Sequence, residues 1–220
     1  MKFKHVIGIF TIGMVLLLSG CGDSPETQIY NHLEAAVQLE EDFQKQQDDI
    51  TKLEQEEQEL YKEIIELGIE EMEQIQELTS KAIASIEGRS EKIKSEKESL
   101  DASREEFEKS KALIEEIKDE EVKNKALSMY EAMVKRFEAY ETLHKTYNES
   151  LTLEKELYNK FLQEDLEEED LQAHIEKVNL KYQEVIEANK TFNDFTLEYN
   201  ELKKSFYEAA EIKVTYIENN

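Results

Sequence analysis

The feature that most constrains the fold is a long stretch without proline, which runs from residue 26 to residue 220 after the single proline, Pro25. Proline interrupts the hydrogen-bond ladder of a helix, and an all-β chain needs many turns that are rich in proline and glycine. The whole chain contains only 6 glycines. The sequence therefore predicts an all-α protein with long, uninterrupted helices.

Apolar residues recur at seven-residue intervals from Ile29 to Ile217 and divide the chain into four helical segments. Breaks between the segments are expected at Gly68, at 118–121 and at 163–165. The first segment carries the series Ile29, Ala36, Phe43, Ile50, Glu57, Ile64, and the second carries Met72, Thr79, Ile86, Ile93, Leu100, Phe107, Ile114. The third segment has three adjacent apolar stripes, as expected where each helix touches two neighbours.

Four segments of similar length joined by short turns predict an elongated, antiparallel, up-and-down four-helix bundle over residues 26–220. The coiled-coil spacing of 3.5 residues implies a left-handed supercoil. The alternatives are a dimeric coiled coil and a pair of stacked shorter bundles with Gly88 as the joint. We expect Gly88 to mark a bend or a close helix contact, and Gly68 to cap the end of a helix.

The first 21 residues have the features of a lipoprotein signal peptide. A basic front precedes an apolar run of 13 residues, Val6 to Leu18, which is shorter than the roughly 20 residues that a membrane-spanning helix needs. The run ends in Leu18-Ser19-Gly20-Cys21, which resembles a lipobox. We expect cleavage of residues 1–20. The alternatives are an ordinary secretory signal and an uncleaved anchor helix.

Cleavage before Cys21 would leave a cysteine that carries a diacylglycerol and, in addition, an N-acyl chain such as palmitate. Two or more long acyl chains hold a protein stably on a membrane. Residues 21–25 would then be a short lipidated tether. The predicted location is the extracytoplasmic face of the cell membrane.

The net charge of −25 restricts the possible partners. Binding to nucleic acid phosphates needs clustered lysine and arginine, so no nucleic acid is expected. Adhesion to anionic lipid headgroups by charge alone is disfavoured for the same reason. The surface is either simply solubilising or one that attracts and is bridged by cations.

Motifs for catalysis or metal binding are scarce. Glu141 and His144 have the Glu-x-x-His spacing of di-iron bundles, but that spacing occurs once where such a site needs it twice. His32 and His174 lack it, and a structural role is expected for His144. The acidic run at 165–170 lacks the EF-hand spacing and is expected to begin a helix. We expect no enzymatic activity, no metal site and no cofactor other than the lipid on Cys21.

Polar residues occupy seven predicted core positions. They either fix the register between long helices or line an opened groove for a ligand. Because a buried charge without a partner costs several kcal/mol, we expect these side chains to pair with one another or to reach water. The seven are Arg89, Glu96, Arg136, Glu154, Asn189, Thr196 and Lys203.

Several short stretches make the chain similar to the YkyA-type lipoproteins of Gram-positive bacteria, to which a role in binding the cell wall is ascribed. They are the box at 18–21, Pro25-Glu26 with Ile29-Tyr30, Glu96 to Leu100, Arg136-Phe137 with Tyr140, Leu157-Tyr158, and the segment Phe192 to Thr196 with Tyr199-Asn200, Lys203 and Phe206-Tyr207. The resemblance covers nearly the whole chain. It implies an all-helical bundle, a role at the cell wall and no known catalytic residue.

The combined prediction is a non-enzymatic, lipid-anchored protein that binds the cell wall or has a structural role in the envelope. Peptidoglycan and its attached polymers are anionic, so contact would require bridging divalent cations or a local groove. The candidate contact surface is Asn193, Tyr199, Asn200, Lys203, Phe206 and Tyr207, whose rings would stack on sugars; helix packing is the alternative for the aromatic members. A rival function is a scaffold or chaperone for exported or envelope proteins, which needs an open apolar groove.

Overall fold

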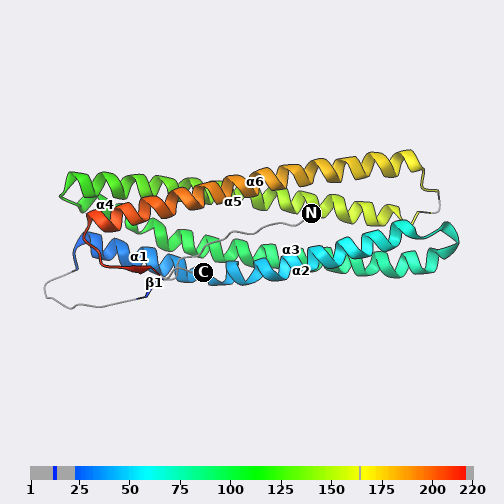
Figure 1. Ribbon diagram of the computed structural model, residues 1–220, viewed down its shortest axis with the longest axis horizontal. Coiled ribbons are helices and arrows are strands. Elements are labelled where there is room, and N and C mark those ends of the chain that lie inside the picture. Colours follow the sequence, from blue (N-terminus) through cyan, green and yellow to red (C-terminus); the bar gives the residue numbers. More distant parts are fainter. Residues whose placement is uncertain (1–11, 14–22, 164, 217–220) are drawn as a thin grey trace. The chain divides into compact units, whose positions relative to one another are not determined.

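The computed structural model describes residues 12–13, 23–163 and 165–216 (Figure 1). Cys21, the predicted lipid attachment site, lies outside the described residues, and so does most of the predicted signal peptide. Within the described part, no helix combines the length and the apolar character needed to cross a membrane.

The described chain is almost entirely helical. The long elements follow one another as α1 (Pro25–Leu39), α2 (Glu41–Glu66), the 3-10 helix η1 (Ile69–Glu71), α3 (Met72–Glu108), α4 (Ser110–Glu116), α5 (Glu120–Lys160) and α6 (Glu168–Ala209). Two strands of two residues each, β1 (Ile12–Gly13) and β2 (Thr215–Tyr216), pair in antiparallel orientation. The all-α class and the four predicted helical segments are therefore confirmed, as α1 with α2, α3 with α4, α5, and α6.

The helices are distributed over two compact units. Among the described residues, unit 1 contains those up to Gln38, Ala102–Ala139 and those from Thr191 onward, and unit 2 contains those within Leu39–Asp101 and Tyr140–Lys190. Helices α3, α5 and α6 contribute to both units. The boundary within α3 lies between Asp101 and Ala102 and not at Gly88.

Neighbouring helices in unit 2 run antiparallel, because residue numbers rise along one helix while they fall along the next. Helices α2 and α3 are joined by the contacts Leu53–Ser85 and Asp49–Lys92. Helices α3 and α5 are joined by Glu87–Lys155 and Lys97–Glu141. Helices α5 and α6 are joined by Glu149–Lys181 and Leu153–His174. This is the predicted up-and-down order.

The core of unit 1 is aromatic. The ring of Phe107 in α3 stacks on Tyr130 of α5, with 5.0 Å between centroids, and meets Phe137 and Tyr199 edge to face at 6.0 and 6.3 Å. Such pairs contribute about 0.5–1.5 kcal/mol beyond the burial of their area. One fully buried ring thus joins segments of α3, α5 and α6.

The first two predicted series are almost entirely buried in the structure. All six positions of the first series, Ile29 to Ile64, are buried. In the second series Thr79, Ile86, Ile93, Leu100, Phe107 and Ile114 are buried, and Met72 is partly buried against the same core. Full burial of a large apolar side chain stabilises a fold by about 1.5–3 kcal/mol, so these series supply much of the stability.

The first predicted segment is interrupted, which its spacing did not reveal. α1 ends at Leu39 and α2 begins at Glu41. The buried hydroxyl of Ser99 in α3 spans the interruption, because it donates to the Leu39 carbonyl (2.6 Å) and accepts from the Phe43 N–H (3.2 Å). A neighbouring helix thus satisfies backbone groups on both sides of the break.

The expectation that Gly68 caps a helix C-terminus is wrong. Its backbone is extended (φ −88°, ψ 165°), whereas a capping glycine adopts the left-handed conformation. Gly68 instead precedes η1, where its N–H donates to Glu71 Oε2 (2.9 Å) and its carbonyl accepts from the Glu71 N–H (2.9 Å). The predicted break between the segments is nevertheless present at this point.

Gly88 marks a close contact between helices. α3 continues through Gly88, and a Cβ added there would lie 3.3 Å from Cδ1 of Leu53 in α2. Such a distance is tighter than most contacts of real Cβ atoms. Of the two expectations for Gly88, the close helix contact is the one the structure shows.

The other two predicted breaks are confirmed. α4 ends at Glu116 and α5 begins at Glu120, where Asp119 Oδ1 accepts from the N–H groups of Glu121 (2.8 Å) and Val122 (3.1 Å). This is the hydrogen bonding of a helix N-cap. The second break separates α5 from α6, and the acidic run places three carboxylates in the first turn of α6, where the helix dipole favours them.

Replacing Ser99 by Ala should destabilise the protein by about 1–3 kcal/mol, because the buried Phe43 N–H and the partly buried Leu39 carbonyl each lose a hydrogen bond at the α1–α2 break. Urea unfolding followed by circular dichroism measures the change. The control is Ser80→Ala, since the exposed Ser80 hydroxyl bonds only to the Gln76 carbonyl of its own helix (2.8 Å), and its effect should stay within about 0.5 kcal/mol. Equal effects of the two substitutions would contradict the bridging role of Ser99.

Candidate functional site

The interior of unit 2 contains a buried ion pair between Arg89 of α3 and Glu154 of α5, whose side chains are 1% and 2% exposed. Burial opposes the charge of Arg89, but the neighbouring Glu154 carboxylate and further groups around it outweigh this, and the pKa of Arg89 is raised. Tyr182 of α6 also interacts with Glu154. Arg89 Nε and Glu154 Oε1 have no hydrogen-bond partner among the described residues, so the pair is incompletely satisfied.

Phenol groups of α5 bind further carboxylates from α2. Tyr158 donates to Glu57, and the Tyr147 hydroxyl donates to Glu54 Oε1 (2.7 Å). Burial raises the pKa of Glu57, while the hydrogen bond from Tyr158 and the charge of Arg89 oppose the rise. The middle of unit 2 is therefore a polar layer in which one guanidinium and several phenols face carboxyl groups of α2 and α5.

A second polar group in unit 2 centres on Glu96, which is 1% exposed. Gln47 of α2 donates to its Oε1, and the Tyr140 hydroxyl of α5 lies 3.4 Å from its Oε2. Burial raises the pKa of Glu96 to about 8, against the lowering effect of these hydrogen bonds. A neutral, protonated Glu96 at pH 7 follows from this value.

Polar core residues in unit 1 are paired as well. The buried Arg136 donates from Nε to Thr196 Oγ1 (3.0 Å), and its guanidinium carbon lies 4.9 Å from the ring centroid of Phe192. The Lys203 ammonium lies 5.5 Å from the Tyr199 ring. The expectation that polar residues at core positions find partners is thus confirmed for Arg89, Glu96, Glu154, Arg136 and Thr196.

The predicted contact surface is not an exposed aromatic surface. Tyr199, Lys203, Phe206 and Tyr207 are all buried, at 4%, 5%, 0% and 0% exposure. Helix packing, the alternative for the aromatic residues, accounts for their positions, since these side chains fill the core of unit 1. Asn193 and Asn200 are partly exposed, and on their own they offer no ring for a sugar to stack on.

Tyr207 also connects the first and last helical segments of unit 1. Its hydroxyl donates to Glu34 Oε1 of α1 (3.0 Å), and its ring meets Tyr30 at 5.4 Å between centroids. The buried phenol and its carboxylate partner therefore hold the N-terminal helix against α6.

The three histidines of the described chain have separate surroundings. His32 Nδ1 lies 2.7 Å from Glu106 Oε1, and His174 Nε2 lies 2.8 Å from the Leu153 carbonyl. His144 packs near the Tyr140 ring, and burial lowers its pKa. In the part of the chain that the structure describes, no group of three or more histidine, cysteine or acidic residues is placed to hold a metal ion.

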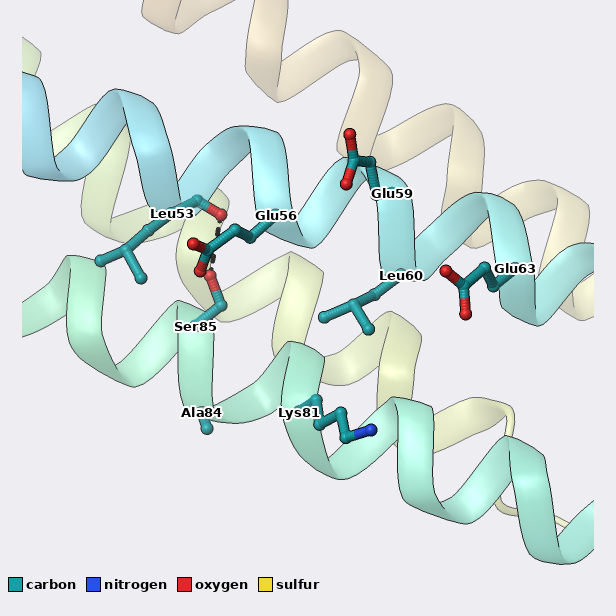
Figure 2. Close-up of a pocket in the computed structure, with 8 residues that line it drawn as sticks. All are labelled: Leu53, Glu56, Glu59, Leu60, Glu63, Lys81, Ala84 and Ser85. Carbon is teal, nitrogen blue, oxygen red and sulfur yellow. Dashed lines mark hydrogen bonds between the residues drawn. The ribbon is translucent and has the colours of Figure 1, made fainter.

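Figure 2 shows a surface groove of unit 2 between α2 and α3, with a volume of about 540 Å³. Its lining combines apolar side chains with charged ones from both helices. The lining residues are Leu53, Glu56, Glu59, Leu60 and Glu63 from α2, and Lys81, Ala84 and Ser85 from α3. The apolar series did not predict this groove, because the charged residues that line the groove lie on exposed helix faces and outside those series.

Small residues on α3 explain why the two helices approach closely at one end of the groove. Ser85 donates to the Leu53 carbonyl (2.9 Å), and Leu53 packs against Gly88. Ala84, which also lines the groove, has only a methyl side chain. The small side chains at Ser85 and Gly88 therefore permit the close approach of α2 and α3 beside the groove.

A family model described as "YkyA: Putative cell-wall binding lipoprotein" matches residues 24–209. The chain belongs to this family. The match covers all the long helices, so the resemblance that the sequence suggested is confirmed over nearly the whole described chain.

Two individual proteins resemble the chain. The "Uncharacterized lipoprotein YkyA" of Bacillus subtilis (strain 168) is 37% identical over 82 residues, which are 37% of this chain and 37% of that protein. The chain thus matches little more than a third of that relative's length. A crystal structure of a "Conserved Protein of Unknown Function from Staphylococcus aureus" has a TM-score of 0.58 at 11% identity, covering 83% of this chain and 93% of the other; this likeness concerns the fold alone.

Replacing Arg89 by Met should destabilise the protein by about 3–5 kcal/mol, because Glu154 would be left as an unpaired buried charge. The double variant Arg89→Met/Glu154→Leu should recover most of this loss, since both charges are removed together. Urea unfolding measures both variants. As a control, Lys81→Met breaks the exposed pair with Glu77 and should change stability by less than about 1 kcal/mol. A double variant no more stable than Arg89→Met would refute the pairing argument.

The free energy of unfolding should fall as the pH rises from about 4.5 to about 8, because folded Glu96 retains its proton in this range and the unfolded chain releases it. Above pH 8 the folded side chain is also ionised and this contribution becomes constant. Glu96→Gln should flatten the pH profile and should be more stable than the wild type at pH 8. Urea unfolding of both proteins at several pH values tests this; parallel profiles would show that Glu96 is not the group responsible.

Proposed function

We propose that this protein is a lipid-anchored, non-enzymatic lipoprotein on the outer face of the cell membrane, and that its helical part contacts the cell wall. The observation that carries the proposal is the family match over residues 24–209, together with the Leu18-Ser19-Gly20-Cys21 sequence that immediately precedes it. The matched family and the relative from Bacillus subtilis both have "lipoprotein" in their descriptions.

A lipid on Cys21 would anchor the chain without any membrane-spanning segment. Each buried CH₂ group contributes about 0.8 kcal/mol, and two or more long chains make anchoring stable. α1 begins at Pro25, only a few residues after Cys21. The helical part would therefore start close to the membrane surface.

Contact with the wall would be governed by charge. A protein with a net charge of −25 is repelled by anionic wall polymers unless cations screen or bridge the two surfaces. We therefore propose that divalent cations support the contact. The bridging would involve exposed carboxylates of the helices and not the buried aromatic residues near the end of α6.

A non-enzymatic role agrees with where the perturbed groups lie. Catalytic groups with shifted pKa values are typically found in clefts that a substrate can enter. Here Glu57, Glu96 and Arg89 lie between helices, and each is bound by another side chain of unit 2. Their perturbation is explained by their place in the core.

The scaffold or chaperone alternative would need a continuous apolar surface. The large apolar side chains that are exposed in the described chain are spread over α1, α2, the connection after α5, and α6. They are Leu39, Ile65, Leu162, Leu180 and Leu197. This distribution gives the alternative no specific support.

Replacing Cys21 by Ala should prevent lipid attachment, so the protein should remain unprocessed or appear in the culture medium. Labelling with a radioactive fatty acid and fractionation of cells into membrane and medium provide the measurement. Ser24→Ala, a change within the predicted tether that leaves Cys21 in place, is the control and should leave labelling unchanged. Normal cleavage and membrane retention of the Cys21→Ala variant would disprove the anchor.

Purified protein should sediment with isolated cell walls in the presence of calcium and should be released by a chelator or by high salt. The same assay with membrane vesicles of neutral lipid separates wall binding from insertion of the lipid. If no enrichment on walls is found at any calcium or salt concentration, the wall-binding proposal fails while the anchor proposal stands.

A further inference from the structure

The groove between α2 and α3 has the chemistry of a peptide-binding site. Its walls carry Leu53, Leu60 and Ala84, so a bound side chain would meet apolar surface (Figure 2). A volume of about 540 Å³ lies within the range of small-ligand pockets, about 300–1,000 Å³. It is large enough for a few residues of a peptide.

The charges around the groove have one predominant sign. Glu56, Glu59 and Glu63 lie on α2 at intervals of three and four residues, and all three line the groove. The facing cation, Lys81, forms an ion pair with Glu77 (2.6 Å) and is therefore partly neutralised. An occupant with positive charges would complement this rim.

The distance between the carboxylates favours an elongated occupant with several amines over a single inorganic cation. From residue 56 to residue 63 a helix rises roughly 10 Å, and no described group of three acidic residues is close enough together to hold a metal ion. A single inorganic cation therefore cannot meet all three carboxylates. An elongated occupant with two or more amines at helical intervals can.

We propose that this groove binds a cationic, amphipathic peptide segment of a partner protein, with an apolar side chain seated against Leu53, Leu60 and Ala84 and with lysine or arginine residues opposite Glu56, Glu59 and Glu63. The carboxylates increase the rate of encounter and fix the register of the peptide, while the apolar floor supplies most of the affinity. This activity is separate from wall binding and does not depend on it.

The test uses the full-length lipidated protein in a non-ionic detergent and a fluorescein-labelled synthetic peptide. The probe is a helical peptide with lysines at positions i, i+3 and i+7 and leucines beside them, and fluorescence anisotropy measures its binding. A peptide of the same composition with a scrambled order is compared with it. The probe should bind at least tenfold more tightly than the scrambled peptide and should be released by salt.

A neutral substitution that fills the groove distinguishes peptide binding in the groove from nonspecific electrostatic attraction to the acidic surface. Ala84→Gln fills the groove without changing the charge, and Ala173→Gln makes the same change at an exposed position of α6 in the same unit. Ala84→Gln should weaken binding at least tenfold, and Ala173→Gln should change it less than twofold. Circular dichroism checks that both variants keep the helical content of the wild type.

Charge removal gives an independent comparison. The triple variant Glu56→Gln/Glu59→Gln/Glu63→Gln should weaken binding at least tenfold. Neutralising three other exposed acids of unit 2, as Asp48→Gln/Glu91→Gln/Glu176→Gln, should weaken it less than threefold, although the net charge changes equally.

Four results with the peptides and the variants would overturn the proposal. They are failure of the probe to bind, equal binding of the scrambled peptide, equal effects of Ala84→Gln and Ala173→Gln, and equal effects of the two triple variants. Competition by the small polyamine spermine at the same concentration as the unlabelled peptide would also overturn it, because the groove would then recognise amines without recognising a peptide.

Discussion

The structure depends on hiding a seven-residue apolar repeat from water. Each helix alone leaves one apolar stripe exposed, and only contact with neighbouring stripes removes it from solvent. The series from Ile29 to Ile64 and from Thr79 to Ile114 are buried throughout, although the chain is strongly acidic. Charged residues on the outer faces keep the protein soluble, and the repeat decides which faces turn inward.

The interior is nevertheless far from purely apolar. Arg89, Glu154, Glu57 and Glu96 lie in unit 2 with phenols as partners, and Arg136 lies in unit 1 against Thr196 and Phe192. Such groups add little net stability compared with apolar residues of the same size, but an incorrect pairing of helices would leave them unpaired at a high cost. Long helices with a regular repeat can slide by one heptad, so we interpret the buried polar pairs as fixing the register.

Function in this protein is expected on the surface, because the core residues that resembled a binding site are occupied. The aromatic cluster near the end of α6 fills the core of unit 1, and Tyr207 is engaged by Glu34. What remains accessible is acidic, and the α2–α3 groove combines that charge with apolar contacts. Membership in a lipoprotein family, a predicted lipid anchor and an acidic helical exterior together suit a protein that works by position and contact.

The sequence by itself determined the helical class, the order of four segments, the breaks near 118–121 and 163–165, and many core positions, because each of these depends on local spacing along one chain. It could not reveal the α1–α2 interruption, since Ser99 lies some 60 residues away from the backbone groups that it binds. It also left open whether the aromatic residues Tyr199, Phe206 and Tyr207 pack in the core or form a sugar-binding surface, and the structure buries all three. Only the tertiary structure decided which partners face Arg89 or Glu96 and where small residues leave a groove beside α2, because these features come from side chains on different helices that meet only after folding.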